Sequence, residues 1–157
     1  MDNIIFLDID GVLNNNRTMS SAPSGCIGIG NSLLNNLYHI VKETNAKIVL
    51  SSTWKKDWDK NPNKCKPDGL YLSKKLNQNN IFIFDKIDDN ISLSKRGYAI
   101  NKYLEQHPEI KHYLILDDWN FDFNDYPHLL DHFIYTDVHI GLTKEHIQQG
   151  INILRKD

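Results

Sequence analysis

Two pairs of carboxylates follow apolar runs in this sequence. Asp8 and Asp10 come directly after residues 4–7, and Asp117 and Asp118 come directly after residues 112–116. Carboxylates this close repel each other, so that one tends to take up a proton unless a cation balances them. Mg²⁺ is a hard ion that prefers carboxylate oxygen and water. The Asp8–Asp10 pair therefore predicts a metal-dependent site, and the second pair repeats its pattern.

The sequence Asp-x-Asp-Gly also occurs in calcium loops and in plain turns. An EF-hand loop needs a glutamate at its twelfth position. Counting from Asp8, that position is Met19, so the calcium-loop interpretation fails. A plain turn stays open as the alternative, although the pair at Asp117 and Asp118 makes it less favoured.

The elements that must position these carboxylates are predicted from hydrophobic periodicity. Apolar runs predict strands at residues 4–7, 47–50, 81–84, 112–116 and 133–135. The intervening segments predict a helix capped by Asn31 or Ser32, a helix at 69–76, a helix from Ser94 to about His107, and a closing helix capped by Thr143. Strands that alternate with helices predict an α/β fold with a central, mostly parallel sheet of about five strands and right-handed crossovers. In such sheets ligands gather at the carboxyl ends of the strands, where both carboxylate pairs lie.

Two further segments carry residues suited to anion chemistry. The second strand ends in Ser51, Ser52 and Thr53, and small hydroxyls beside backbone N–H groups suit an anion. Capping of a helix is the alternative interpretation of these hydroxyls. Trp54 either packs in a loop or lines the substrate entrance, and the sequence favours neither.

Composition limits the class of protein. With 157 residues and 40% hydrophobic content, the chain predicts one domain over residues 1–157, which could be part of a longer protein. The net charge of -2, from 18 basic and 20 acidic residues, gives no argument for binding nucleic acid or membranes.

The sequence shows no signal peptide and no apolar run of about 18 residues, which predicts a cytoplasmic protein, with non-classical delivery elsewhere left open. Cys26 and Cys65 are expected to be free thiols.

The order of these features resembles the haloacid dehalogenase-like (HAD) superfamily of Mg²⁺-dependent phosphohydrolases. The first motif matches Asp8 to Gly11, the second matches the strand ending at Ser51, the third matches Lys95 or Arg96, and the fourth matches Asp117 and Asp118. The segments 50–54, 96–97 and 141–143 look like the small HAD domains of bacterial, viral and RNA-repair-associated proteins. The resemblance implies a Rossmann-like three-layer sandwich with a minimal cap.

The resemblance also implies roles for these residues. Asp8 would be the nucleophile that forms an aspartyl-phosphate, and Asp10 would be the general acid and base. Asp8, the Asp10 carbonyl and Asp117 or Asp118 would hold Mg²⁺. The remaining candidates would contact the substrate or its phosphate: Gly11, Ser51, Ser52, Trp54, and either Lys95 or Arg96 as the cation.

The substrate is expected to be a phosphate on a macromolecule. The insertions at 14–30 and 55–68 are too short for a large cap, and an open site suits a phosphoprotein, such as one carrying phosphotyrosine, or a nucleic-acid end. The near-neutral charge mildly disfavours nucleic acid. Small substrates stay open, and a monomer is favoured. The alternative to an enzyme is a non-catalytic interaction domain or a phospho-acceptor domain; the presence of Asp10 argues against the latter, because an acid/base there would hasten hydrolysis.

Overall fold

A five-stranded parallel sheet forms the centre of the protein. The computed structural model describes residues 2–157. Its strands are β1 (Asn3–Leu7), β2 (Lys47–Leu50), β3 (Ile83–Lys86), β4 (His112–Asp117) and β5 (Phe133–Tyr135), in the order β3-β2-β1-β4-β5. All neighbouring strands pair in parallel. The expected α/β fold is confirmed.

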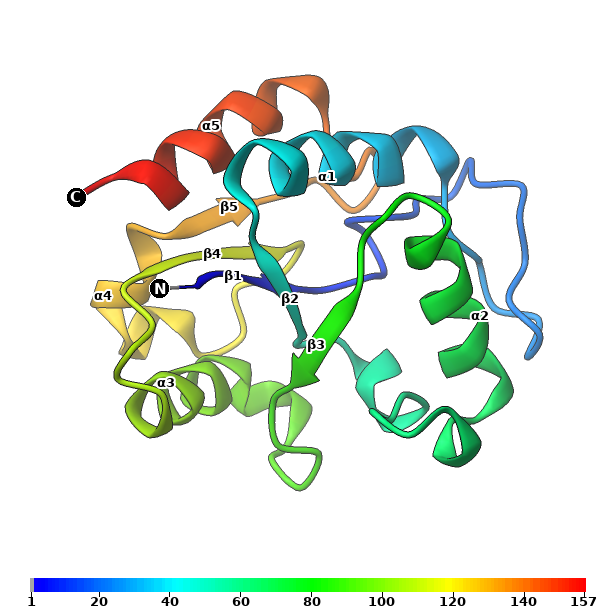
Figure 1. Ribbon diagram of the computed structural model, residues 1–157, viewed down its shortest axis with the longest axis horizontal. Helices are drawn as coiled ribbons and strands as arrows, with labels where there is room; N and C mark the ends of the chain where they lie inside the picture. Colours follow the sequence, from blue (N-terminus) through cyan, green and yellow to red (C-terminus); the bar gives the residue numbers. More distant parts are fainter. Residues whose placement is uncertain (1) are drawn as a thin grey trace.

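Helices cover both faces of this sheet (Figure 1). The α-helices are α1 (Asn31–Thr44), α2 (Pro67–Asn77), α3 (Arg96–Gln106), α4 (Pro127–Leu130) and α5 (Lys144–Arg155). Short 3₁₀ turns are η1 (Thr53–Lys56), η2 (Pro62–Lys64), η3 (Leu93–Lys95) and η4 (Phe123–Asp125). In Figure 1, α1 and α5 lie together on one face, α3 lies on the opposite face, and α2 lies beyond β3. The three layers match the Rossmann-like sandwich that was expected.

The strand β1 explains why the sheet is buried on both faces. Side chains alternate between the faces of a strand. Ile5 and Leu7 belong to the hydrophobic core under α1 and α5, whereas Ile4 and Phe6 belong to the core on the α3 side. A continuous apolar run is therefore what this central parallel strand requires.

The strand order also fixes where a ligand can bind. β1 pairs with β2 on one side and with β4 on the other. The chain winds from β1 outward to β3 and then returns to the other side of β1 with β4. In sheets of this type the crevice at this reversal, outside the carboxyl ends of the strands, is the usual ligand site. Asp8 and Asp117 flank it.

Four element boundaries differ from the sequence-based expectation. α2 covers Pro67–Asn77 rather than 69–76. β3 covers 83–86 rather than 81–84, because the N–H of Ile81 bonds to the Leu76 carbonyl and closes the end of α2. α1 has Gly30 at its N-cap, without a side-chain cap from Asn31 or Ser32. Ser94 lies within η3, so that α3 begins only at Arg96. The capping role of Thr143 at α5 is confirmed.

None of the helices in residues 2–157 combines the length and the apolar character needed to cross a membrane.

Candidate active site

Three carboxylates meet at the crevice between β1 and β4. Asp8 follows β1, Asp117 ends β4, and Asp118 comes next; each can offer an oxygen within 4.8 Å of the others. The backbone N–H of Asp8 donates to the carbonyl of Leu116 at 3.0 Å, which continues the β1–β4 ladder. The sheet itself therefore holds the two buried carboxylates in place, and they come together as the two sequence pairs suggested.

Arg96 is the cation that faces these carboxylates. Its Nη1 lies 2.7 Å from Asp117 Oδ2 and 3.2 Å from Asp8 Oδ1, and the residue is only 4% exposed. Lys95 is exposed on the preceding turn. Of the two adjacent cations that the third motif left open, Arg96 is the one that contacts the acidic cluster.

The loop after β4 places Arg96. The carboxylate of Asp122 accepts hydrogen bonds from the N–H groups of Gly97 (2.6 Å) and Tyr98 (3.1 Å), which are unpaired donors in the first turn of α3. A negative charge at a helix N-terminus also suits the helix dipole. The ring of Phe121 lies 4.4 Å from the Arg96 guanidinium carbon and packs against it. The start of α3 is therefore fixed by a residue from another segment, not by Ser94.

Asp10 stands apart from the three-carboxylate cluster. Its side chain is exposed, and it accepts hydrogen bonds from Asn14 Nδ2 at 2.9 Å and from Trp54 Nε1 at 3.2 Å. Trp54 is buried, which leaves little of its ring for a substrate. Trp54 and Asn14 thus orient Asp10 from two different loops.

Gly11 allows Asp118 to approach Asp8. Its φ of 80° lies in the left-handed region, and a Cβ at this position would overlap the Asp118 carboxylate. Its N–H donates to Asn14 Oδ1 at 3.0 Å, and its carbonyl accepts from Thr136 Oγ1 at 2.8 Å. Gly11 is thus required for the shape of the site.

The turn after β2 contributes hydroxyls and a buried lysine. Ser51 is buried, and its Oγ has no hydrogen-bond partner within residues 2–157. Ser52 Oγ accepts from the N–H of Trp54 at 3.2 Å and caps η1, as the alternative interpretation of these hydroxyls proposed. Lys55 is buried, and it lines one small cavity together with Ser51 and Arg96. Ser51 is thus the hydroxyl left available to an anion.

The electrostatics of the cluster favour a bound cation. Burial, and then the neighbouring Asp117, raise the pKa of Asp8 well above its ordinary range, while Arg96 opposes the rise. Burial likewise raises the pKa of Asp117, although Arg96 lowers it. The single positive charge of Arg96 does not neutralise the negative charges of three carboxylates. All three offer hard oxygen donors, so the cluster fits Mg²⁺.

Sequence reasoning missed three residues of the site: Asn14, Lys55 and Asp122. Asn14 was assigned to a loop, Lys55 to a polar insertion, and Asp122 to no element. The one-turn spacing of Lys55 from Ser51 was the only sequence signal for it. Burial lowers the pKa of Lys55, because removal from water disfavours its charged ammonium form.

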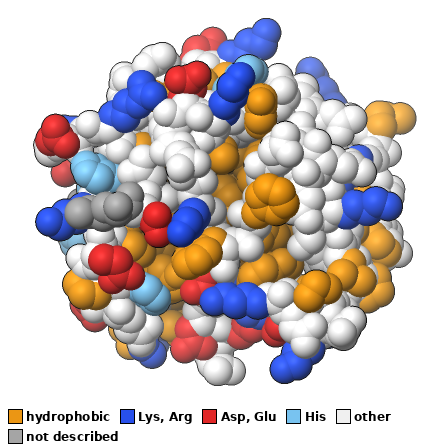
Figure 2. All heavy atoms as spheres, viewed as in Figure 1, with side chains coloured by type: hydrophobic (Ala, Val, Ile, Leu, Met, Phe, Trp, Pro, Cys, Tyr) orange, Lys and Arg blue, Asp and Glu red, His pale blue; other side chains and the backbone are white. Residues whose placement is uncertain are grey.

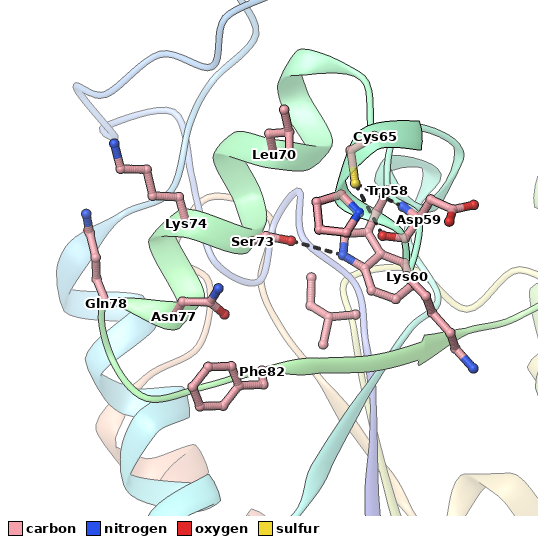
Figure 3. A pocket seen from close by; sticks show the side chains of 12 residues that line it. Trp58, Asp59, Lys60, Cys65, Leu70, Ser73, Lys74, Asn77, Gln78 and Phe82 are labelled. Carbon is pink, nitrogen blue, oxygen red and sulfur yellow. Dashed lines mark hydrogen bonds between the residues drawn. The ribbon is translucent and has the colours of Figure 1, made fainter.

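A separate hollow lies away from the acidic cluster, between α2, η2 and the start of β3 (Figure 3). It measures about 610 Å³, and Trp58 forms part of its wall through a 3.0 Å bond from Nε1 to Ser73 Oγ. Leu70 and Phe82, which line this hollow, are exposed. Figure 2 shows hydrophobic side chains gathered near the middle of the molecular face that it displays. None of the candidate site residues lines this hollow.

One comparison with known proteins gives a match. A family model described as "HAD domain in Swiss Army Knife RNA repair proteins" matches residues 4–147. The matched region contains both carboxylate pairs, Ser51 and Arg96. No curated protein and no solved structure matches the chain.

Proposed function

Since the chain belongs to the family of HAD domains in Swiss Army Knife RNA repair proteins, we propose that it is a Mg²⁺-dependent phosphatase that acts through an aspartyl-phosphate on Asp8. The observation that carries this proposal is the contact of Asp8 with Arg96 inside the three-carboxylate cluster. A buried carboxylate at the ligand crevice, facing a cation, is suited to attack an electrophilic phosphorus.

In the first step, a carboxylate oxygen of Asp8 attacks phosphorus. The bond from phosphorus to the leaving oxygen breaks, and Asp10 gives that oxygen a proton. Asp10 is suited to this task because it is exposed and oriented by Asn14 and Trp54. Arg96 offsets negative charge as the phosphoryl group moves onto Asp8.

In the second step, water attacks phosphorus of the aspartyl-phosphate. Asp10, now ionised, accepts a proton from that water. The bond between phosphorus and the Asp8 oxygen breaks, which frees inorganic phosphate and restores the Asp8 carboxylate. Ser51 Oγ is placed to donate to a phosphate oxygen, because it has no other partner within residues 2–157.

Mg²⁺ would be held by Asp8, Asp117 and Asp118, together with the main-chain carbonyl of Asp10. When bound, it would neutralise charge on the phosphoryl oxygens as a Lewis acid. The raised pKa values of Asp8 and Asp117, caused first by burial and then by neighbouring carboxylates, support this assignment, because a bound cation would stabilise the charged form of both groups.

The substrate that we propose is the phosphorylated end of a nucleic acid. The family description, which concerns RNA repair proteins, supports it. Among the described residues, the segments 14–30 and 55–68 form loops, an isolated bridge between Ser21 and Ile27, short 3₁₀ turns and the first residues of α2, so they build no large cap over the site. The net charge of -2 fits recognition of a terminus rather than of a long phosphate backbone.

The test is release of inorganic phosphate from a panel of substrates. Oligonucleotides with a 5′- or a 3′-phosphate, a phosphotyrosine peptide and an aryl phosphate would be compared with Mg²⁺ and with EDTA. Hydrolysis of an oligonucleotide end, lost with EDTA and restored by Mg²⁺, is expected. Full turnover without divalent metal would contradict the metal role, and hydrolysis of the peptide alone would overturn the substrate assignment.

A further inference from the structure

A second hollow shares Asp118 with the acidic cluster. It measures about 560 Å³ and is lined by Asp118, Trp119, Tyr135, Thr136, Asp137 and Val138. Trp119 is 59% exposed and Tyr135 is 52% exposed. Large exposed aromatic side chains that line a hollow beside a reactive centre are typical of a binding surface.

The same backbone that holds the carboxylates holds these two aromatic residues. The backbone N–H of Trp119 donates to Asp117 Oδ1 at 3.1 Å. Tyr135 is the register partner of Asp117 in the pairing of β4 with β5. The backbone N–H of Thr136, a residue that lines the hollow, donates to the Asp117 carbonyl at 2.9 Å and extends the β4–β5 ladder by one bond. The hollow is therefore fixed relative to Asp8, as a site for the rest of the substrate must be.

The charge of the lining restricts what can bind. Asp118 and Asp137 line the hollow, and no lysine or arginine does so among residues 2–157. A second phosphate would be repelled there, while an uncharged planar ring could stack on Trp119 or Tyr135. Asp137 Oδ1 accepts from the N–H of His139 at 2.8 Å, which leaves the other carboxylate oxygen for a ligand donor.

We propose that this hollow binds the base of the terminal nucleotide whose phosphate is bound at Asp8. This inference rests on the proposed function and adds a second site to it. A nucleobase offers N–H or amino donors for Asp137 as well as an aromatic face for Trp119 and Tyr135. The phenyl ring of phosphotyrosine offers the face without the donors, so the lining favours the base.

The kinetic test compares two substrates that differ only in the base. One is a short oligonucleotide with a terminal phosphate, and the other has an abasic sugar at the phosphorylated position. Stacking of one base on an aromatic side chain is worth about 5- to 150-fold in affinity. The parent protein should therefore prefer the base-bearing substrate in kcat/KM by a factor in that range. Trp119→Ala and Tyr135→Ala should each bring this ratio towards one.

The matched control is Phe82→Ala, which removes a more exposed aromatic ring from the hollow near α2. Phe82→Ala should keep the parent's ratio of kcat/KM between the base-bearing and the abasic substrate. A parent ratio near one, or a ratio unchanged in both Trp119→Ala and Tyr135→Ala, would overturn the inference while leaving the phosphatase function intact. The inference would also be overturned if Trp119→Ala and Tyr135→Ala both lowered kcat/KM for a phosphotyrosine peptide but not for the oligonucleotide. That result would indicate a protein substrate.

A binding measurement separates this inference from the proposed function. Titration calorimetry with Mg²⁺ would compare adenosine monophosphate with ribose 5-phosphate, using Asp8→Asn protein so that neither ligand turns over. Tighter binding of the nucleotide, lost on adding Trp119→Ala, supports the base site even if the parent protein hydrolyses no phosphate. Equal binding of the two ligands contradicts it.

Discussion

At the scale of single residues, Asp10 and Asp8 have different environments that suit different tasks. Asp8 is buried against Arg96 and Asp117, whereas Asp10 is exposed and accepts two hydrogen bonds from neutral donors. The chain leaves the sheet between them, so that Asp8 stays buried at the end of β1 and Asp10 lies exposed in the following turn. A nucleophile and an acid/base pair can therefore arise from four consecutive residues ending at Gly11.

The indole N–H of Trp54 should matter for catalysis through Asp10. Trp54→Phe keeps a ring in the core but removes the donor to Asp10 Oδ2. One hydrogen bond is worth about 0.5–1.5 kcal/mol, so kcat should fall up to about tenfold, and more for alkyl phosphates, whose leaving group needs a proton. Steady-state kinetics over substrates of different leaving-group pKa would measure this.

Trp58→Phe is the matched control. Trp58 is equally buried and also donates its indole N–H, but to Ser73. If both variants lose the same activity with no dependence on the leaving group, Trp54 has only a structural role.

The raised pKa of Asp8 predicts how stability depends on pH without metal. The folded protein holds this proton more tightly than the unfolded chain does, because of burial and then Asp117. The resulting stabilisation is complete below the unfolded pKa of about 3.9 and is lost as pH rises through the raised folded value. At pH 7 without divalent metal, Asp8→Asn should therefore raise Tm, by about 2–4 °C for each kcal/mol of relieved burial and repulsion.

Thermal unfolding between pH 4 and pH 8, with EDTA or with Mg²⁺, would check this. Mg²⁺ should raise the Tm of the parent far more than that of Asp8→Asn. Asp125→Asn, which removes an exposed carboxylate, should leave the parent's dependence of Tm on pH unchanged. A lower Tm for Asp8→Asn at pH 7 in EDTA would show that Asp8 is not under electrostatic strain.

At the scale of elements, the loop after β4 controls the start of α3. Asp122 accepts from the N–H groups of Gly97 and Tyr98, next to Arg96. Asp122→Ala should lower the free energy of unfolding by about 0.5–2 kcal/mol, the usual range for loss of a cap. It should also lower kcat/KM, because Arg96 would lose its fixed position. Denaturant unfolding and steady-state kinetics would measure the two effects.

Asp125→Ala serves as the control, because it removes an exposed carboxylate from the same loop. If Asp122→Ala and Asp125→Ala change stability and activity equally, the Asp122 cap does not position Arg96.

The elements that the sequence predicted well are those with local signals. β1 and β4 are continuous apolar runs that end in acids, and α5 has its cap at Thr143. Ile81 was assigned to a strand because it is apolar, but it is buried by closing α2. An apolar side chain such as that of Ile81 allows its burial to be predicted from the sequence. The hydrogen-bond partner of its backbone, which decides whether it belongs to a strand or to the end of a helix, cannot be predicted in this way.

The same limit applies to the site. Asp8, Asp117 and Arg96 could be predicted because each stands at an element boundary within a recognisable order. The bond from Trp54 to Asp10 joins two segments that only the folded chain brings together, whereas the bond from Asn14 is local. Nothing in the local sequence distinguishes Asn14 from the neighbouring asparagines.

At the scale of the whole molecule, charge predicts how a nucleic-acid substrate is recognised. The chain carries a net charge of -2, and in the part of the chain that the structure describes no lysine or arginine lines the hollow beside Asp118. Each phosphate contact that releases counterions makes affinity more salt-dependent, with a slope of about -0.7 on a logarithmic scale for single strands. We expect kcat/KM for a phosphorylated end to change little between about 3 and 20 nucleotides and to depend weakly on salt.

Kinetics with an oligonucleotide length series at several salt concentrations would measure this. A steep rise of kcat/KM with length, together with a strong salt dependence, would show that the protein follows the phosphate backbone instead of the terminus.

The topology unites these observations. The reversal of strand order beside β1 brings Asp8, Asp117 and Tyr135 to one edge of the sheet, although they lie far apart in the sequence. The chemistry at Asp8 and the surface beside Asp118 are thus parts of one crevice. We propose that this crevice carries a phosphoryl group on Asp8 and that Asp10 helps to remove it.

Rapid-quench kinetics of Asp10→Asn with a radiolabelled, activated aryl phosphate test that claim most directly. Such a leaving group needs little help from a proton, so Asp8 should still be phosphorylated, while the attack of water slows by about a hundred- to ten-thousand-fold. We predict that label accumulates on the protein to about one phosphate per molecule, is released by hydroxylamine as an acyl phosphate, and is absent when Asp8→Asn is added. Hydrolysis as fast as in the parent, with no labelled protein, would contradict the account.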